Sequence, residues 1–112
     1  MTQEQQKRLS LQDINVGLQV LSSVPADGLV ENIRIKGFVK AVNDAVGFTP
    51  KVDITLPANP DKAFYVNGTV EALRKLCDIE QDIEIQGRLI KAIRKGETLH
   101  RSLQPKNAEM SR

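Results

Sequence analysis

The sequence predicts an all-β fold: a five-stranded barrel with one short helix and an extra element at its N-terminus. Several segments alternate apolar and polar residues, as strands with one buried face do. Three such segments are followed by one helix-like segment and then by two more strands, without the repeated strand–helix alternation of parallel α/β folds. The 112 residues suffice for one domain with a modest core.

The N-terminal third begins with a polar stretch, residues 1–9, which predicts a flexible N-terminus. Residues 10–29 form the extra element, a strand or a helix followed by a turn. Strict alternation over residues 14–20 favours the strand, whereas Ser10 is a typical start of a helix. We favour the strand slightly, with a proline- and glycine-containing turn at residues 25–28.

The first barrel strand is predicted over residues 30–42. Successive side chains of a strand point to opposite faces. One parity carries the apolar side chains of Ile33, Ile35 and Val39. The other parity carries three cations and one aromatic ring: Arg34, Lys36, Phe38 and Lys40. A large ring on the charged face needs an explanation, either a ligand or a covering segment.

The second and third strands are predicted at residues 51–57 and 62–67. Thr69 is a good N-cap for a short helix that ends at Cys77, and its apolar stripe is Val70, Leu73, Leu76 and Cys77. The fourth strand begins near Asp82 and ends at a Lys95–Gly96 hairpin turn. The fifth strand completes a domain of residues 30–103, and residues 104–112 are predicted to be a flexible tail.

This element order, with glycines inside two long strands, resembles OB-fold nucleic-acid-binding proteins. The resemblance covers residues 30–103 and is carried by IRIKGFVKAV around Gly37 and DIEIQGRLIKAI around Gly87. Small bacterial single-stranded DNA-binding and primosomal replication proteins are the nearest type. The resemblance implies a non-enzymatic protein of replication, recombination or plasmid maintenance, with DNA preferred over RNA.

OB-folds that bind single strands stack bases on aromatic rings. We therefore predict that Phe38 is a stacking platform, the alternative being a ring covered by the N-terminal segment or by a partner chain. Tyr65 is a second platform if Phe64 points inward. Phe48 either clamps a base or plugs the end of the barrel, and we favour the plug.

Basic residues on the strands and their connecting loops are predicted to contact phosphates, without sequence preference. They are Arg34, Lys36, Lys40, Lys51, Arg88, Lys91, Arg94, Lys95 and Arg101. The alternating acids Glu80, Asp82 and Glu84 would repel phosphate, and they equally fit edge protection or a protein partner. The rival hypothesis is accordingly an OB-fold protein-interaction module or structural subunit.

An enzyme is not expected, because the single histidine, His100, and the single cysteine, Cys77, supply no metal-ligand set. Cys77 lies on the apolar face of the predicted helix, so we expect it to be buried and inert. We predict no cofactor and no metal. With one cysteine, no secretory signal and no run of eighteen apolar residues, the sequence favours the cytoplasm and no membrane span. We also expect a homo-oligomer.

Overall fold

The described residues fold into four α-helices, so the predicted five-stranded OB-fold barrel is wrong. The computed structural model describes residues 2–47 and 54–103, and none of these residues lies in a strand. The helices are α1 (Gln3–Ser23), α2 (Leu29–Val46), α3 (Lys62–Ile79) and α4 (Ile83–Ser102). The resemblance to OB-fold proteins rested on the predicted order of strands, and the helical structure does not support it.

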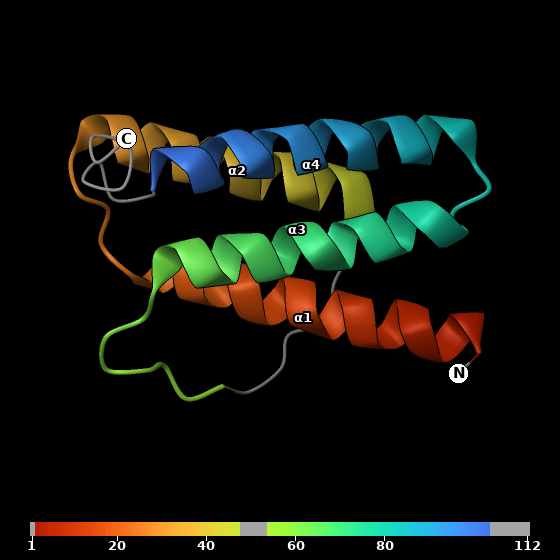
Figure 1. Cartoon of the computed structure of the whole chain (residues 1–112), viewed down its shortest axis with the longest axis horizontal. Helices are drawn as coiled ribbons and strands as arrows, with labels where there is room; N and C mark the ends of the chain where they lie inside the picture. The colour runs from red at the N-terminus through yellow and green to blue at the C-terminus, as the bar shows by residue number, and fades with distance from the viewer. Residues whose placement is uncertain (1, 48–53, 104–112) are drawn as a thin grey trace, which may run out of the picture.

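The helices form a bundle of two layers, with α2 beside α4 in one layer and α1 beside α3 in the other (Figure 1). Helices α1 and α4 run in one direction, and α2 and α3 run in the opposite direction. Helix α3 bridges the layers by packing on α4 as well as on α1, whereas α1 and α2 have few contacts. Because α2 and α3 are parallel, the connection between them returns along the length of the bundle.

Each helix begins at a residue whose side chain or backbone suits an N-terminus. Thr2 caps α1 by accepting the N–H of Gln5 at 3.2 Å, so the segment expected to be flexible belongs to α1 from Gln3 onward. Asp61 caps α3, and Asp82 caps α4 by accepting the N–H of Glu84 at 2.9 Å. Asp82 therefore starts a helix where the sequence analysis placed a strand.

The α2 segment replaces the predicted first strand because its buried residues follow the helical period. They are Ile35, Phe38, Val42 and Ala45. Ile33 belongs to the alternating apolar set, yet it is exposed, whereas Phe38 of the opposite set is only 1% exposed. A spacing of three and four residues is the signature of a helix that packs on one face.

Helix α3 confirms part of the predicted short helix and extends it by two turns. Val70, Leu73 and Leu76 are buried as expected, and Cys77 is half-buried at the edge of the core. The predicted third strand, residues 62–67, is instead the beginning of this helix. Thr69 lies inside it, and its hydroxyl donates to the Tyr65 carbonyl at 2.8 Å rather than capping a terminus.

Helix α4 joins the two segments predicted as the fourth and fifth strands. Its buried residues are Leu89, Ala92, Gly96 and Leu99. The predicted hairpin turn at Lys95–Gly96 is helix interior, and so is Gly87, which was expected to bend a barrel strand.

In α1, of the two alternatives for residues 10–24, the structure shows the helix. Of the predicted second strand, residues 51–53 lie outside the described residues, and residues 54–57 are neither helix nor strand.

Two glycines let helices approach closely inside the bundle. A Cβ on Gly17 of α1 would overlap the Thr69 hydroxyl of α3, so these two helices touch almost backbone to backbone. A Cβ on Gly96 of α4 would collide with Val70 of α3 and with the Phe38 ring of α2. The ring thus fills the space that Gly96 leaves, and this contact explains the aromatic residue among the cations of α2.

A half-buried ion pair ties the α1–α2 connection to the start of α3. The Lys62 ammonium lies 2.6 Å from the Glu31 carboxylate and donates to the Pro25 carbonyl at 3.2 Å. The N–H of Asp27 donates to the same carboxylate at 2.7 Å. Burial would raise the pKa of Glu31, but the hydrogen bonds from Lys62 and Asp27 outweigh it and hold this pKa below its ordinary value of 4.5.

Candidate nucleic-acid interface

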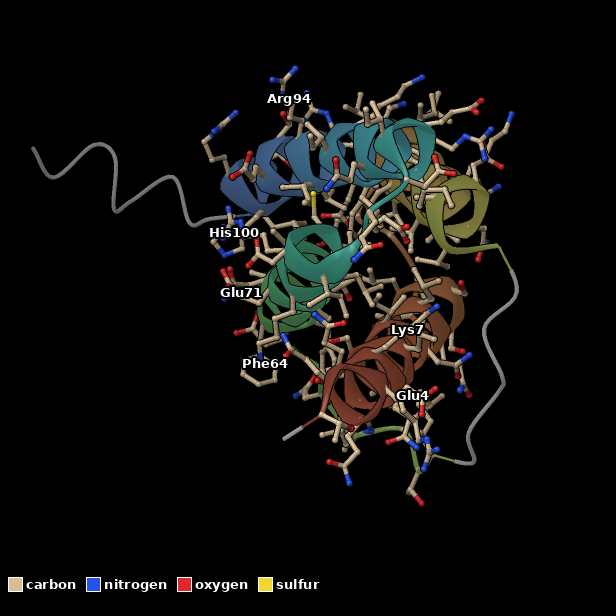
Figure 2. All side chains as sticks on the ribbon, turned by 90° about the vertical axis from the view of Figure 1, so that its right-hand side faces the viewer. Glu4, Lys7, Phe64, Glu71, Arg94 and His100 are labelled. Atoms are coloured by element: carbon tan, nitrogen blue, oxygen red, sulfur yellow. The ribbon has the colours of Figure 1, made fainter. Side chains whose placement is uncertain are left out.

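The described basic residues that were predicted to contact phosphate lie in one layer of the bundle despite the different fold. Arg34, Lys36 and Lys40 are exposed on α2, and Arg88, Lys91, Arg94, Lys95 and Arg101 are exposed on α4. Because α2 and α4 lie side by side in one layer, their outer surfaces form a continuous α2–α4 face. Figure 2 shows Arg94 projecting from α4 away from the other layer. Lys51, the remaining predicted cation, lies outside the described residues.

Charge is distributed unevenly between the two layers. Helices α2 and α4 carry the eight basic residues just named and four acidic ones, which are Glu31, Asp44, Glu84 and Glu97. Helices α1 and α3 carry five basic residues, Lys7, Arg8, Lys62, Arg74 and Lys75, and four acidic ones, Glu4, Asp13, Glu71 and Asp78. The excess of positive charge therefore lies on the α2–α4 layer.

Most acids of the α2–α4 layer are already engaged. Glu31 pairs with Lys62, and Glu97 pairs with Arg74, so both carboxylates form ion pairs with cations of α3. Glu84 pairs with Arg88 at 3.2 Å along α4. Within residues 2–47 and 54–103, no ion pair is formed by the six cations Arg34, Lys36, Lys40, Lys91, Arg94 and Lys95. These six cations are available to an anionic ligand.

The seam between α2 and α4 contains two adjoining hollows. The basic hollow is lined by Gly37, Lys40, Ala41, Asp44, Arg88, Lys91 and Lys95. It contains four cations from two helices, one carboxylate and no large apolar side chain. Cations that converge from two sides of a groove suit the track of a phosphate backbone. The basic hollow is therefore the strongest anion-binding feature of the α2–α4 face.

The second hollow, here called the apolar hollow, lies nearer the N-terminus of α2 and the C-terminus of α4. Its lining consists of Ile33, Arg34, Gly37, Phe38, Arg94, Lys95 and Thr98. Gly37 and Lys95 border both hollows. In the apolar hollow, however, the cations stand around a surface formed by isoleucine and the edge of the phenylalanine. That combination suits a partner with both apolar and acidic groups.

The aromatic residues do not form the predicted stacking platform. Phe38 is a core residue, so its role as an exposed platform is corrected; α4 and α3 cover the ring, rather than the N-terminal segment or a partner chain. Tyr65 is half-buried, and Phe64, which was expected to point inward, is 67% exposed. Figure 2 places Phe64 on α3, far from Arg94. Phe48 lies outside the described residues.

The histidine and the cysteine do not come together as a catalytic or metal-binding set. His100 lies near the end of α4, and Cys77 near the end of α3. In the described part of the chain, no group of three or more metal-ligating side chains is close enough to hold an ion. Among these same residues, no helix has the length and hydropathy that crossing a bilayer requires.

Comparison with known proteins adds no family to this description. No family model matches the chain, and neither a curated protein nor a solved structure matches it. The assignment of a function therefore depends on the α2–α4 face itself.

Sequence reasoning missed the exposed apolar residues that accompany the cations on this face. They are Leu29, Val30 and Ile33 on α2, and Ile83 and Ile90 on α4. Of these residues, Ile33 and Ile83 had been assigned to the apolar face of an alternating strand. A helical wheel would have separated them, because Ile33 falls on the side of α2 opposite to Ile35 and Val42.

Proposed function

We propose that this chain is a non-enzymatic nucleic-acid-binding protein that holds a phosphate backbone in the basic hollow of the α2–α4 face. The observation that carries the proposal is the convergence of Lys40, Arg88, Lys91 and Lys95 from two adjacent helices. Basic side chains that neutralise phosphates release counterions, which gives affinity without sequence preference. A role in replication, recombination or plasmid maintenance, and a cytoplasmic location, stay predictions.

The helical fold changes what this binding should look like. A preference for single-stranded DNA was expected from the OB-fold resemblance and from base stacking on Phe38. Neither support remains, and the basic hollow contains no aromatic ring. Affinity should therefore come from phosphates alone, so single strands and duplexes of the same length should both bind, as should DNA and RNA.

The first experiment is fluorescence anisotropy with a labelled oligonucleotide of about thirty bases and with its duplex, at about 50 and about 200 mM salt. Four phosphate contacts predict a slope of log affinity against log salt of about −3 for the single strand, and slightly steeper for the duplex. The double variant Lys40→Ala with Lys91→Ala should make this slope shallower by about 1.4 for the single strand.

The matched control is the double variant Lys7→Ala with Lys75→Ala. Both of its lysines are exposed, lie on α1 and α3, and change the net charge by the same amount. This control should keep the full slope. If it loses as much slope as the α2–α4 pair, binding follows overall charge and the basic hollow is not the site. If neither oligonucleotide binds at about 50 mM salt, the proposed function is wrong.

A further inference from the structure

The apolar hollow, together with the first turn of α2, is an apolar surface with a cationic rim. Ile33 lines the hollow and is 61% exposed, and Leu29 and Val30 of the preceding turn are exposed as well. Arg34, Arg94 and Lys95 stand around this surface without ion pairs among the described residues. A cluster of exposed apolar side chains rimmed by charge is typical of a protein interaction site.

The opposite end of the same layer carries the complementary surface, the acidic knob, which comprises Glu80, Asp82, Ile83 and Glu84. Ile83 is the first residue of α4 and is 83% exposed, the highest value among the large apolar side chains that the structure describes. Acidic residues stand on both sides of it. Asp82 and Glu84 are exposed, and Glu80 is half-buried. Ile83 is thus an exposed apolar side chain between acidic residues, whereas the apolar hollow is concave and has cations around it.

A single chain cannot bring these two surfaces together. Ile83 and Arg94 lie on the same straight helix, eleven residues apart, which is about 16 Å at the rise of an α-helix. Figure 1 shows the α3–α4 turn and the N-terminus of α2 at opposite ends of the bundle. The acidic knob can therefore reach only the apolar hollow of another copy.

We propose that this chain self-associates head to tail, with Ile83 of one copy inserted into the apolar hollow of the next. Asp82 then faces Arg34 and Arg94 of that neighbour, while Glu84 stays paired with Arg88 of its own helix. Charge decides against a symmetric dimer in which two hollows meet, because the same cations would oppose each other. An oligomer built in this way keeps a free knob at one end and a free hollow at the other, so association continues into longer oligomers as the concentration rises.

The experiment is sedimentation velocity of the full chain from about 10 to about 300 μM, at about 50 and about 500 mM salt. The average mass should rise above the 12.4 kDa of one chain with concentration, and the rise should be smaller at high salt. Ile83→Lys removes the tip of the knob, and Ile33→Lys removes a wall of the hollow. Each variant alone should remain monomeric.

Mixing the two variants tests whether the knob of one copy binds the hollow of another, and growth of the wild type beyond a dimer distinguishes head-to-tail association from a reciprocal two-fold dimer. Ile83→Lys retains an intact hollow and Ile33→Lys retains an intact knob, so an equimolar mixture should form a one-to-one dimer and nothing larger. Ile90→Lys is the matched control: it makes the same change at an exposed position of α4 outside both surfaces, and it should associate like the wild type. Circular dichroism should show equal helicity in all variants.

Three results would overturn the proposal: a monomeric wild type at about 300 μM and low salt, undiminished association of Ile83→Lys, or a mixture of the two variants that stays monomeric. Ile83 lies outside the basic hollow, so the Ile83→Lys variant retains all four cations of that hollow. The Ile83→Lys variant should therefore bind the labelled oligonucleotide with the unchanged salt slope, so the two proposals can fail separately.

Discussion

The two layers of the bundle differ in how their helices pack and in how many of their cations form ion pairs. In the α1–α3 layer, Gly17 and Thr69 bring the backbones together, and two of the three α3 cations are engaged in ion pairs. In the α2–α4 layer, the seam opens into two hollows, and seven of the eight cations, Arg101 included, have no ion pair within the described residues. The comparison indicates that the α1–α3 layer and the ion pairs of α3 stabilise the fold, while the α2–α4 layer exposes cations that a ligand can contact.

The largest expected effect concerns the one aromatic side chain that belongs to the core of the open layer. Replacing Phe38 by alanine should cost about 3–5 kcal/mol of unfolding free energy, because the ring fills the space against Gly96. Urea denaturation measures the loss. Phe64→Ala, which removes an exposed ring, should change stability by less than about 0.5 kcal/mol. Equal losses in the two variants would contradict the assignment of Phe38 to the core.

The close contact between α1 and α3 can be tested by adding a single methyl group at Gly17. Gly17→Ala should destabilise the protein by about 1–3 kcal/mol, since the added methyl group meets the Thr69 hydroxyl and lies near the Tyr65 carbonyl. In the Gly17→Ala background, Thr69→Ser retains the hydroxyl, so the clash with the added methyl group should persist, whereas Thr69→Gly should relieve it. Thermal or urea denaturation of these variants would show whether the close approach is real.

The tie between the layers should make stability depend on pH. Removing its cation by Lys62→Ala should cost about 1–3 kcal/mol at neutral pH, because the Glu31 carboxylate loses a charged hydrogen bond. The folded pKa of Glu31 lies below 4.5, so its stabilisation is complete above that value and is lost as the pH falls through the folded pKa. Glu31→Gln should therefore flatten the dependence of unfolding free energy on pH below about pH 5. An unchanged profile would contradict this role.

The smallest effect has the opposite sign and completes the comparison. A Cβ on Gly37, in the interior of α2, meets no atom within 4 Å, so Gly37→Ala should stabilise the protein by about 0.5–1 kcal/mol through helix propensity. The same substitution is thus expected to destabilise the protein at Gly17 of α1 and to stabilise it at Gly37 of α2. Because Gly37 borders both hollows, its alanine variant should also be assayed for oligonucleotide binding. A loss of stability at this position would mean that the α2–α4 seam is tighter than described.

The sequence alone predicted the exposure of the cations but not the fold, for a physical reason. Exposed lysine and arginine residues face water in any fold, so Lys40, Lys91 and Lys95 were correctly expected on the surface. Which of them converge depends on helix pairing, which one sequence does not display. In α3, the spacing of Val70, Leu73 and Leu76 allowed only a helix, and that prediction was confirmed.

In α2 and α4, two periods competed within the same residues. Ile33, Ile35 and Val39 alternate like a strand, while Ile35, Phe38 and Val42 repeat like a helix, and β-branched side chains favoured the strand. The buried stripe of α4 includes Ala92 and Gly96, which carry too little apolar surface to be recognised as core. Tertiary packing, not local propensity, selected the helix in both segments.

The packing of Phe38 against Gly96 also has a consequence for folding during synthesis. Phe38 emerges well before the glycine on which it rests, and α1 offers α2 few contacts in the meantime. The tie through Lys62 likewise joins the α1–α2 connection to a residue made later. The apolar face of α2 therefore lacks its partners until α3 and α4 have been translated, and we expect the native structure to form only then.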